Sequence, residues 1–143
     1  MNPQTFANHT RWHRPFHFFV VPVMLINFIW VIVLFVKAPG WTSGWWIIFS
    51  AALVVLTFLV RLNSLKVQDR LIRLEEKIRY QQILSPALLA QTSALTTRQI
   101  VALRFASDRE LEELVSAVLA GKFSKTGEIK RAIKDWRADT FRV

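Results

Sequence analysis

The sequence predicts an all-α integral membrane protein, in which two transmembrane helices form a hairpin, the second helix extends into the cytoplasm and a small C-terminal helical domain follows. Three observations predict this fold class. Residues 18–36 and 45–60 are long apolar runs without a charged side chain, and runs of about this length span the roughly 30 Å hydrocarbon core of a bilayer as helices. A short segment with Pro and Gly, residues 37–44, separates them. Every Lys and Arg lies outside both runs.

This pattern divides the chain into four parts. They are a cytoplasmic or interfacial N-terminal segment (1–16), the transmembrane hairpin (17–60), a cytoplasmic extension of its second helix (61–85) and a small cytoplasmic helical domain (86–143). Pro15 suits the first turn of helix one, because its missing N–H needs no partner there. Pro22 lies deeper and removes a backbone hydrogen bond, so we expect a kink in the first third of the span.

Polar and small side chains within the apolar runs predict where the helices pack. Asn27 lies near the middle of the first run and needs a hydrogen-bond partner in hydrocarbon. In an antiparallel hairpin it is within a turn of Ser50 and Thr57 in the second run. Ser50 and Ala51 are small enough to let another backbone approach closely. We expect these four residues to make contacts within the hairpin or between subunits.

The position of the hairpin in the bilayer follows from its aromatic and basic residues. Trp12, Trp41, Trp45 and Trp46 flank the runs, as interfacial anchors do. The turn carries one basic residue, Lys37, whereas two arginines precede helix one and six basic residues follow helix two between residues 61 and 79. The positive-inside rule then places both termini in the cytoplasm of a multi-pass protein of the bacterial inner membrane.

Beyond the bilayer, residues 61–84 contain no Gly or Pro and are rich in strong helix formers, so helix two is expected to continue. A narrow apolar stripe with coiled-coil-like spacing runs along it, formed by Val67, Leu71, Leu74 and Ile78. Such a stripe must be buried, either against copies of itself in a short coiled coil or under the C-terminal segment.

After Pro86 the pattern changes to short amphipathic segments. We expect helical pieces at 86–91, from Thr96 or Thr97 to 105, from Ser107 or Asp108 to Gly121, and at 125–138. The segment from residue 108 begins DRELEE, which would repel phosphates, so the sequence does not favour nucleic acid as a partner.

The sequence favours a protein without enzymatic activity. It has no cysteine, no phosphate-binding or dinucleotide motif and no nucleophile elbow. His9, His13 and His17 recur every fourth residue and are candidate ligands for a metal, haem or pigment. Against this hypothesis, His9 and His17 would lie about 12 Å apart on a helix, too far to share one ion. We therefore expect interfacial histidines and predict no cofactor.

Four segments carry a resemblance to a known family. They are NHTRWHRPFHFF near the start, QDRLIRLEEKIR after helix two, LRFASDREL in the tail and DWRADTFRV at the end. In this order they resemble an uncharacterised family of small two-span bacterial inner-membrane proteins, seen chiefly in acidobacteria and their neighbours. The resemblance implies no activity and no functional residues.

Three functional hypotheses remain open at this point. The leading one is a non-enzymatic assembly or adaptor subunit, homo-oligomeric and in contact with the lipid bilayer and with possible other membrane subunits. The second is an oligomeric pore or channel, in which Asn27, Ser50 and Thr57 line a path. The third is a membrane subunit that binds haem, a metal or a pigment through His9, His13 or His17.

Overall fold

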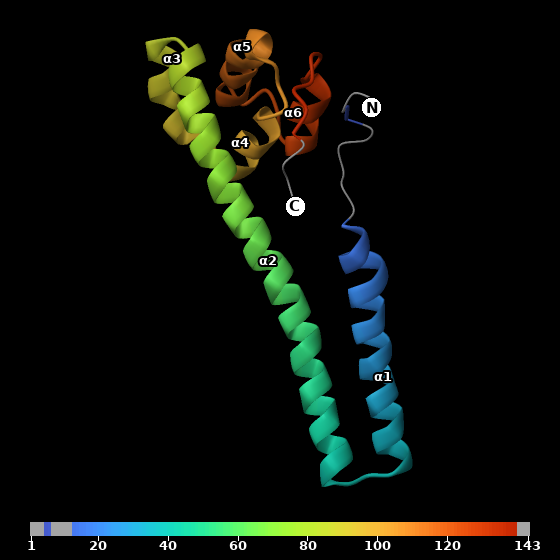
Figure 1. Ribbon diagram of the computed structural model, residues 1–143. Helices are drawn as coiled ribbons and strands as arrows, with labels where there is room; N and C mark the ends of the chain where they lie inside the picture. The colour runs from blue at the N-terminus through green and yellow to red at the C-terminus, as the bar shows by residue number, and fades with distance from the viewer. Residues whose placement is uncertain (1–4, 7–12, 140–143) are drawn as a thin grey trace. The chain divides into compact units, whose positions relative to one another are not determined.

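The computed structural model describes residues 5–6 and 13–139, and every regular element in this part of the chain is a helix. Contacts between residues divide the chain into two units (Figure 1). The hairpin unit contains the described residues up to Leu65, and the C-terminal unit contains those from Lys66 onward together with Thr5 and Phe6. The all-helical fold class with two candidate membrane spans is confirmed.

The first helix of the hairpin unit contains a local change of helix type. A π-helical turn, η1 (Phe16–Val20), precedes α1 (Val21–Lys37), and the N–H of Val21 donates to the carbonyl of Phe16, five residues back. Pro22 follows directly. A proline lacks the N–H and its ring clashes with the carbonyl four residues back in a regular α-helix. The wider π turn lies at the place where the sequence predicts a kink.

The turn of the hairpin is shorter than the predicted segment 37–44. α1 ends at Lys37 and α2 begins at Trp41, so only Ala38 to Gly40 connect them. The hydroxyl of Ser43 donates to the carbonyls of Ala38 (2.9 Å) and Gly40 (3.0 Å). The first bond satisfies a carbonyl at the C-terminal end of α1, whereas the carbonyl of Gly40 also accepts from the N–H of Gly44 at 2.9 Å. Trp41, Trp45 and Trp46 consequently belong to the first turns of α2.

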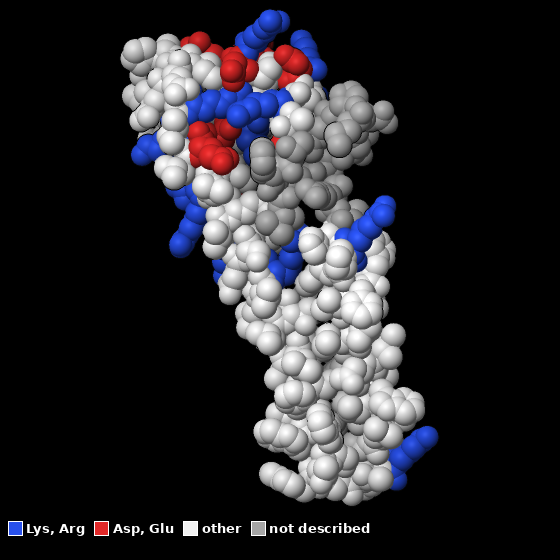
Figure 2. Space-filling model, viewed as in Figure 1, with Lys and Arg blue, Asp and Glu red and all other residues white. Residues whose placement is uncertain are grey.

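The helix α2 (Trp41–Ile83) is continuous over 43 residues, or about 64 Å at a rise of 1.5 Å per residue. It is therefore about twice as long as a bilayer core requires. Two helices, Phe16–Lys37 and Trp41–Ile83, are long and apolar enough to cross a membrane, and their most apolar stretches are 0% and 6% buried. On the face drawn in Figure 2, charged side chains are absent from the described surface of the hairpin between its ends.

The C-terminal unit packs short helices around one hydrophobic core. These are α3 (Pro86–Gln91), η2 (Thr92–Ala94), α4 (Thr97–Leu103), α5 (Asp108–Leu119) and α6 (Thr126–Ala132). The core includes Leu103, Phe105, Leu111, Val115 and Ile129, each at most 1% exposed, and Tyr80 of α2 at 2%. Thr96, one of the two predicted caps, is the residue that caps α4, and it does so through a reciprocal pair with Gln99.

The last predicted helix, residues 125–138, is wrong in length. α6 ends at Ala132, and Ile133 has extended backbone angles. Beyond it, the N–H groups of Lys134 and Asp135 donate to the carboxylate of Glu110 (3.1 and 3.2 Å), and Trp136 forms an isolated β-bridge with Ala106. Because these partners replace the hydrogen bonds of another helical turn, the chain continues in an extended conformation.

Candidate functional site

The C-terminal unit leaves one apolar face of α2 uncovered. Val67, Leu71, Leu74 and Ile78, here called the α2 stripe, are 65%, 54%, 57% and 50% exposed. At 3.6 residues per turn these four side chains share one side of the helix, and Ile72, Glu76 and Tyr80 lie on roughly the opposite side. Ile72 is 5% exposed and Tyr80 2%. The C-terminal helices therefore cover one side of α2 and leave the stripe free.

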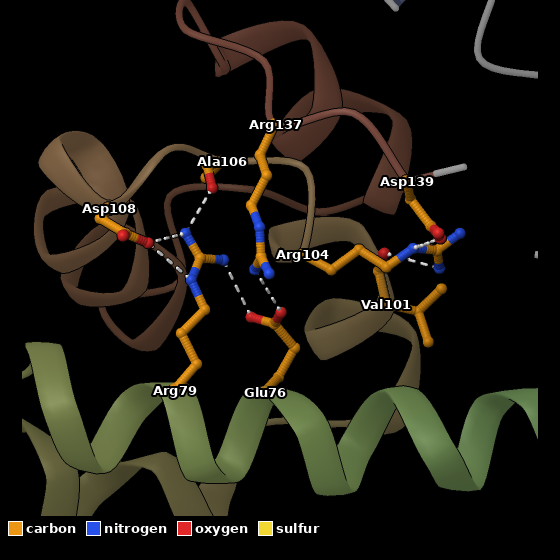
Figure 3. A network of polar contacts seen from close by, with 8 residues as sticks. All are labelled: Glu76, Arg79, Val101, Arg104, Ala106, Asp108, Arg137 and Asp139. Atoms are coloured by element: carbon orange, nitrogen blue, oxygen red, sulfur yellow. Dashed lines mark hydrogen bonds and ion pairs between the residues drawn. The ribbon is translucent and has the colours of Figure 1, made fainter. Parts of the chain in front are cut away.

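A network of ion pairs holds the C-terminal segments on the covered side (Figure 3). The guanidinium of Arg79 donates to one oxygen of Asp108 at 2.8 and 2.6 Å, to the carbonyl of Ala106 at 2.7 Å and to Glu76 at 3.2 Å. Arg137 reaches the other oxygen of Glu76 at 3.4 Å. Arg79 is 8% exposed and Glu76 3%, whereas the side chains of Asp108 and Arg137 are 69% and 55% exposed, so a buried pair on α2 meets partners that reach the solvent.

Burial dominates the electrostatics of this network. Burial raises the pKa of Glu76 above its ordinary value, although the guanidinium groups of Arg79 and Arg137 act in the opposite direction. Beside it, burial lowers the pKa of Arg104, whose Nε pairs with Asp139 at 2.9 Å and so partly offsets that loss of hydration. A guanidinium stays charged under these conditions. The network thus links α2, the start of α5 and the extended segment after α6.

The charges that flank the α2 stripe differ from side to side. By helix geometry, Arg70 and Lys77 lie along one flank and Glu75 along the other. Among the described residues, none of these three side chains has an ion-pair partner. In a parallel coiled coil, a residue on one flank faces the residue five positions further along on the other helix. Arg70 of one chain would then face Glu75 of a second chain, and the reverse.

Within the hairpin unit, polar side chains pair across the two helices. The amide nitrogen of Asn27 donates to the hydroxyl of Ser50 at 2.8 Å, and Ser50 is 1% exposed. Thr57 instead donates to the carbonyl of Leu53 in its own helix at 2.8 Å. Near the other end of the spans, the Arg61 guanidinium lies 5.8 Å from the ring centroid of Phe16. Asn27 and Ser50 are thus brought together, whereas Thr57 is not part of this contact.

The histidines offer no metal site among the described residues, where no group of three His, Cys, Asp or Glu side chains is close enough to hold an ion. The Nδ1 of His17 lies 3.0 Å from the carbonyl of His13, and its ring packs edge-on against Phe16 at 5.0 Å. His9 and Trp12 lie outside the described residues. A ring nitrogen bonded to backbone is the arrangement expected of an interfacial histidine.

Comparison with known proteins identifies the chain's family. The model of a family of unknown function, DUF6526, matches residues 1–143. The chain belongs to DUF6526. No curated protein and no solved structure matches it. The resemblance inferred from four sequence segments, to an uncharacterised family, is thereby confirmed.

In this DUF6526 protein, some of the residues singled out from sequence are surface features. Trp41, Trp45 and Trp46 are 89%, 54% and 52% exposed at the turn end of α2, and Ala51 is half-buried near Ser50. Sequence reasoning missed Glu76 and Arg79 because it did not distinguish them from the other charged residues of α2. The signal that could have found them is a second apolar set on α2, formed by Ile72, Tyr80 and Ile83 at helical spacing.

Proposed function

We propose that this DUF6526 protein is a non-enzymatic assembly or adaptor subunit of the bacterial inner membrane, and that it associates with a second copy of itself through the α2 stripe. The observation that carries the proposal is the exposure of the stripe, from 50% at Ile78 to 65% at Val67, next to an almost completely buried opposite side. A narrow apolar face with heptad-like spacing on a charged helix is typical of helices that bury it against another helix.

Exposed apolar side chains of the hairpin unit support a location in lipid. Ile26, Phe18 and Ile48 are 67%, 68% and 62% exposed, and monomeric soluble proteins rarely expose large contiguous apolar surfaces. The excess of Lys and Arg near the ends away from the turn favours cytoplasmic termini under the positive-inside rule.

Three observations favour a second copy as the occupant of the stripe. Chains inserted with the same orientation pair in parallel, and that arrangement places Arg70 opposite Glu75 in both directions. Asn27 is exposed within the apolar span, and its carboxamide oxygen has no hydrogen-bond partner in the described part of the chain, so a neighbouring span would satisfy it. The stripe covers only about three turns, but attachment to the membrane raises the effective concentration of a second copy.

Cysteine cross-linking in native membranes tests this proposal, because the chain has no cysteine of its own. Leu71→Cys and Ile78→Cys, introduced one at a time, are expected to give a disulfide-linked dimer under mild oxidation. The matched control is Lys122→Cys, an exposed position after α5 on the C-terminal unit. The mass of the complex in mild detergent should be a multiple of the chain's own mass.

The proposal of self-association fails under either of two results. One is a monomeric mass in mild detergent together with equal cross-linking at positions 71, 78 and 122. The other is a stoichiometric partner of different sequence that occupies the stripe, so that Leu71→Cys links to that partner and never to itself.

Location and orientation have a separate test. A reporter fused after Val143 is expected to be active on the cytoplasmic side, and the protein should stay with vesicles during carbonate extraction. A periplasmic reporter, or release by carbonate, would contradict the proposed topology without bearing on the stripe.

A further inference from the structure

The C-terminal unit contains a cavity of about 630 Å³ between α2 and the segments that follow it. This volume falls in the range of small-molecule sites, about 300–1,000 Å³. Arg70, Arg73 and Lys77 of α2 line it, and Thr92 and Ser93 of η2 add two hydroxyl groups. The cavity is separate from the ion-pair network of Figure 3, whose residues do not line it.

The charge of the cavity has one sign. Three cations line it, and no Asp or Glu among the described residues does. On a helix, residues 70, 73 and 77 follow one another at spacings of three and four, so their side chains extend from one flank on successive turns. In the described part of the chain, none of the three has an ion-pair partner. Like charges without a counter-ion repel one another, so this arrangement favours an anion between them.

Apart from the amide of Gln81, the remaining lining is apolar, and it includes Leu74 of the α2 stripe. Leu89, Leu95 and Ile100 contribute to it together with the ring of Tyr80. Tyr80 is 2% exposed, and its hydroxyl has no hydrogen-bond partner among the described residues. A buried hydroxyl without a partner is uncommon in folded proteins and calls for an explanation. Because that hydroxyl is buried, a ligand in the cavity would contact the ring of Tyr80 and not its hydroxyl.

We propose that this cavity binds a phosphate ester with a net negative charge that carries an apolar body. Arg70 and Arg73 offer planar guanidinium groups that match phosphate oxygens in pairs, and Lys77 adds a point charge. The leucines and Ile100 accommodate the apolar part. Two sources share this chemistry: an anionic phospholipid and a soluble phosphorylated metabolite. The site goes beyond the proposed function because it is a ligand-binding activity, although it shares Leu74 with the α2 stripe and Arg70 with its flank.

The test uses the full chain in a neutral detergent. It is titrated with short-chain phosphatidic acid, with phosphatidylcholine of the same chain length and with glycerol 3-phosphate, and binding is followed by native mass spectrometry and thermal unfolding. We expect phosphatidic acid to bind and raise the unfolding temperature, and phosphatidylcholine to do neither. The variant Arg73→Gln/Lys77→Gln should weaken binding at least about tenfold, since two charge-assisted contacts are lost.

A matched control carries the same charge change elsewhere. Arg109→Gln/Lys122→Gln removes two exposed cations that do not line the cavity, and it should bind phosphatidic acid as the parent chain does. Arg70 is left in place because it flanks the α2 stripe. Both double variants change exposed side chains, so we expect both to fold. Their unfolding temperatures without ligand check this.

The arms of the titration separate the two sources. Binding that requires the acyl chains supports a lipid, whereas comparable binding of glycerol 3-phosphate supports a soluble ester. The proposal is overturned if phosphatidic acid and phosphatidylcholine bind alike, if no probe binds, or if the cavity variant and the control variant bind phosphatidic acid equally well.

Discussion

Ser50 shows how one small side chain sets the approach of the two apolar helices. It is 1% exposed in a helix whose other faces are mostly open, because it packs where Asn27 donates to its hydroxyl. Ala52, two residues further on, is exposed. Enlarging the side chain to Leu should therefore cost much more stability at Ser50 than at Ala52.

We predict that Ser50→Leu destabilises the hairpin by about 1–3 kcal/mol, since extra methyl and methylene groups in a packed contact force the helices apart. The exposed Ala52→Leu should change its stability by much less. Unfolding of the full chain in mixed micelles with increasing dodecyl sulfate measures both. Equal midpoints for the two variants would show that Ser50 is not a packing contact.

Glu76 gives the C-terminal unit a predictable dependence on pH. Its pKa is raised above 4.5 in the folded chain, so between the two pKa values the folded state holds a proton that the unfolded state has released. The stability contributed by this proton is complete below pH 4.5 and is lost as pH rises through the raised pKa. Glu76→Gln cannot titrate.

The expected result is that the unfolding temperature of the parent chain falls relative to that of Glu76→Gln as pH rises from 4.5 toward neutrality. Thermal unfolding of both proteins in the same detergent, at a series of pH values, measures this difference. A constant difference across the series would mean that Glu76 titrates normally. The network could not be predicted from sequence, because Arg79 finds Asp108 29 residues away and the carbonyl of Ala106 27 residues away.

At the scale of single elements, the flanks of α2 predict the direction of pairing. Arg70→Glu would place two acidic groups opposite each other in a parallel pair of chains, and Arg70→Glu/Glu75→Arg would restore opposite charges. We expect the single variant to weaken dimerisation by about 1 kcal/mol over the two symmetric contacts and the double variant to recover most of it. Analytical ultracentrifugation in density-matched detergent measures both. An antiparallel pair would show no recovery.

The end of α5 depends on one glycine. Gly121 has a φ of +73°, the N–H of Lys122 donates to the carbonyl of Ala117, and that of Gly121 donates to Val118. This is a Schellman motif, which favours glycine because other residues are strained at positive φ.

Gly121→Ala is therefore expected to cost about 1–2 kcal/mol of stability in the C-terminal unit. Gly127→Ala is the matched control, because Gly127 lies in α6 without positive φ and an added Cβ meets no atom within 4 Å. It should leave stability unchanged or raise it by up to about 1 kcal/mol. Chemical denaturation followed by circular dichroism distinguishes the two variants.

The elements differ in how far the sequence predicts them. Local signals were sufficient for α3 and for the start of α4, because Pro86 and the cap residue Thr96 act within a few residues. They failed for α6, whose amphipathic pattern continues to residue 138 although Glu110 holds the following backbone from 24 residues away. Hydrogen bonds between residues so far apart do not produce a periodic pattern in the sequence.

For the whole molecule, apolar length and charge distribution were enough to predict two candidate spans, since hydropathy is a property of composition. They were not enough to show which side of α2 the tail covers. Ile72 and Tyr80 are interrupted by Glu76 and Arg79, so their face was less apparent than the stripe. Only the folded C-terminal unit distinguishes the two sides.

Removal of the tail tests this division at the scale of the whole chain. A chain truncated after Leu84 keeps Val67 to Ile78 but uncovers Ile72 and Tyr80, which are 5% and 2% exposed in the complete chain. We expect it to form larger and more heterogeneous complexes in mild detergent than the full chain, as judged by light scattering. A complex of unchanged size would mean that the covered side does not attract neighbours.

The burial of Ile72 and Tyr80 thus affects association between chains as well as stability. A helix with exposed apolar faces on two opposite sides can bind further helices without limit, whereas a helix with one such face is saturated by a single partner. In the proposed self-association, residues 86–139 would therefore limit the size of the complex, because they cover one side of α2 from within the same chain.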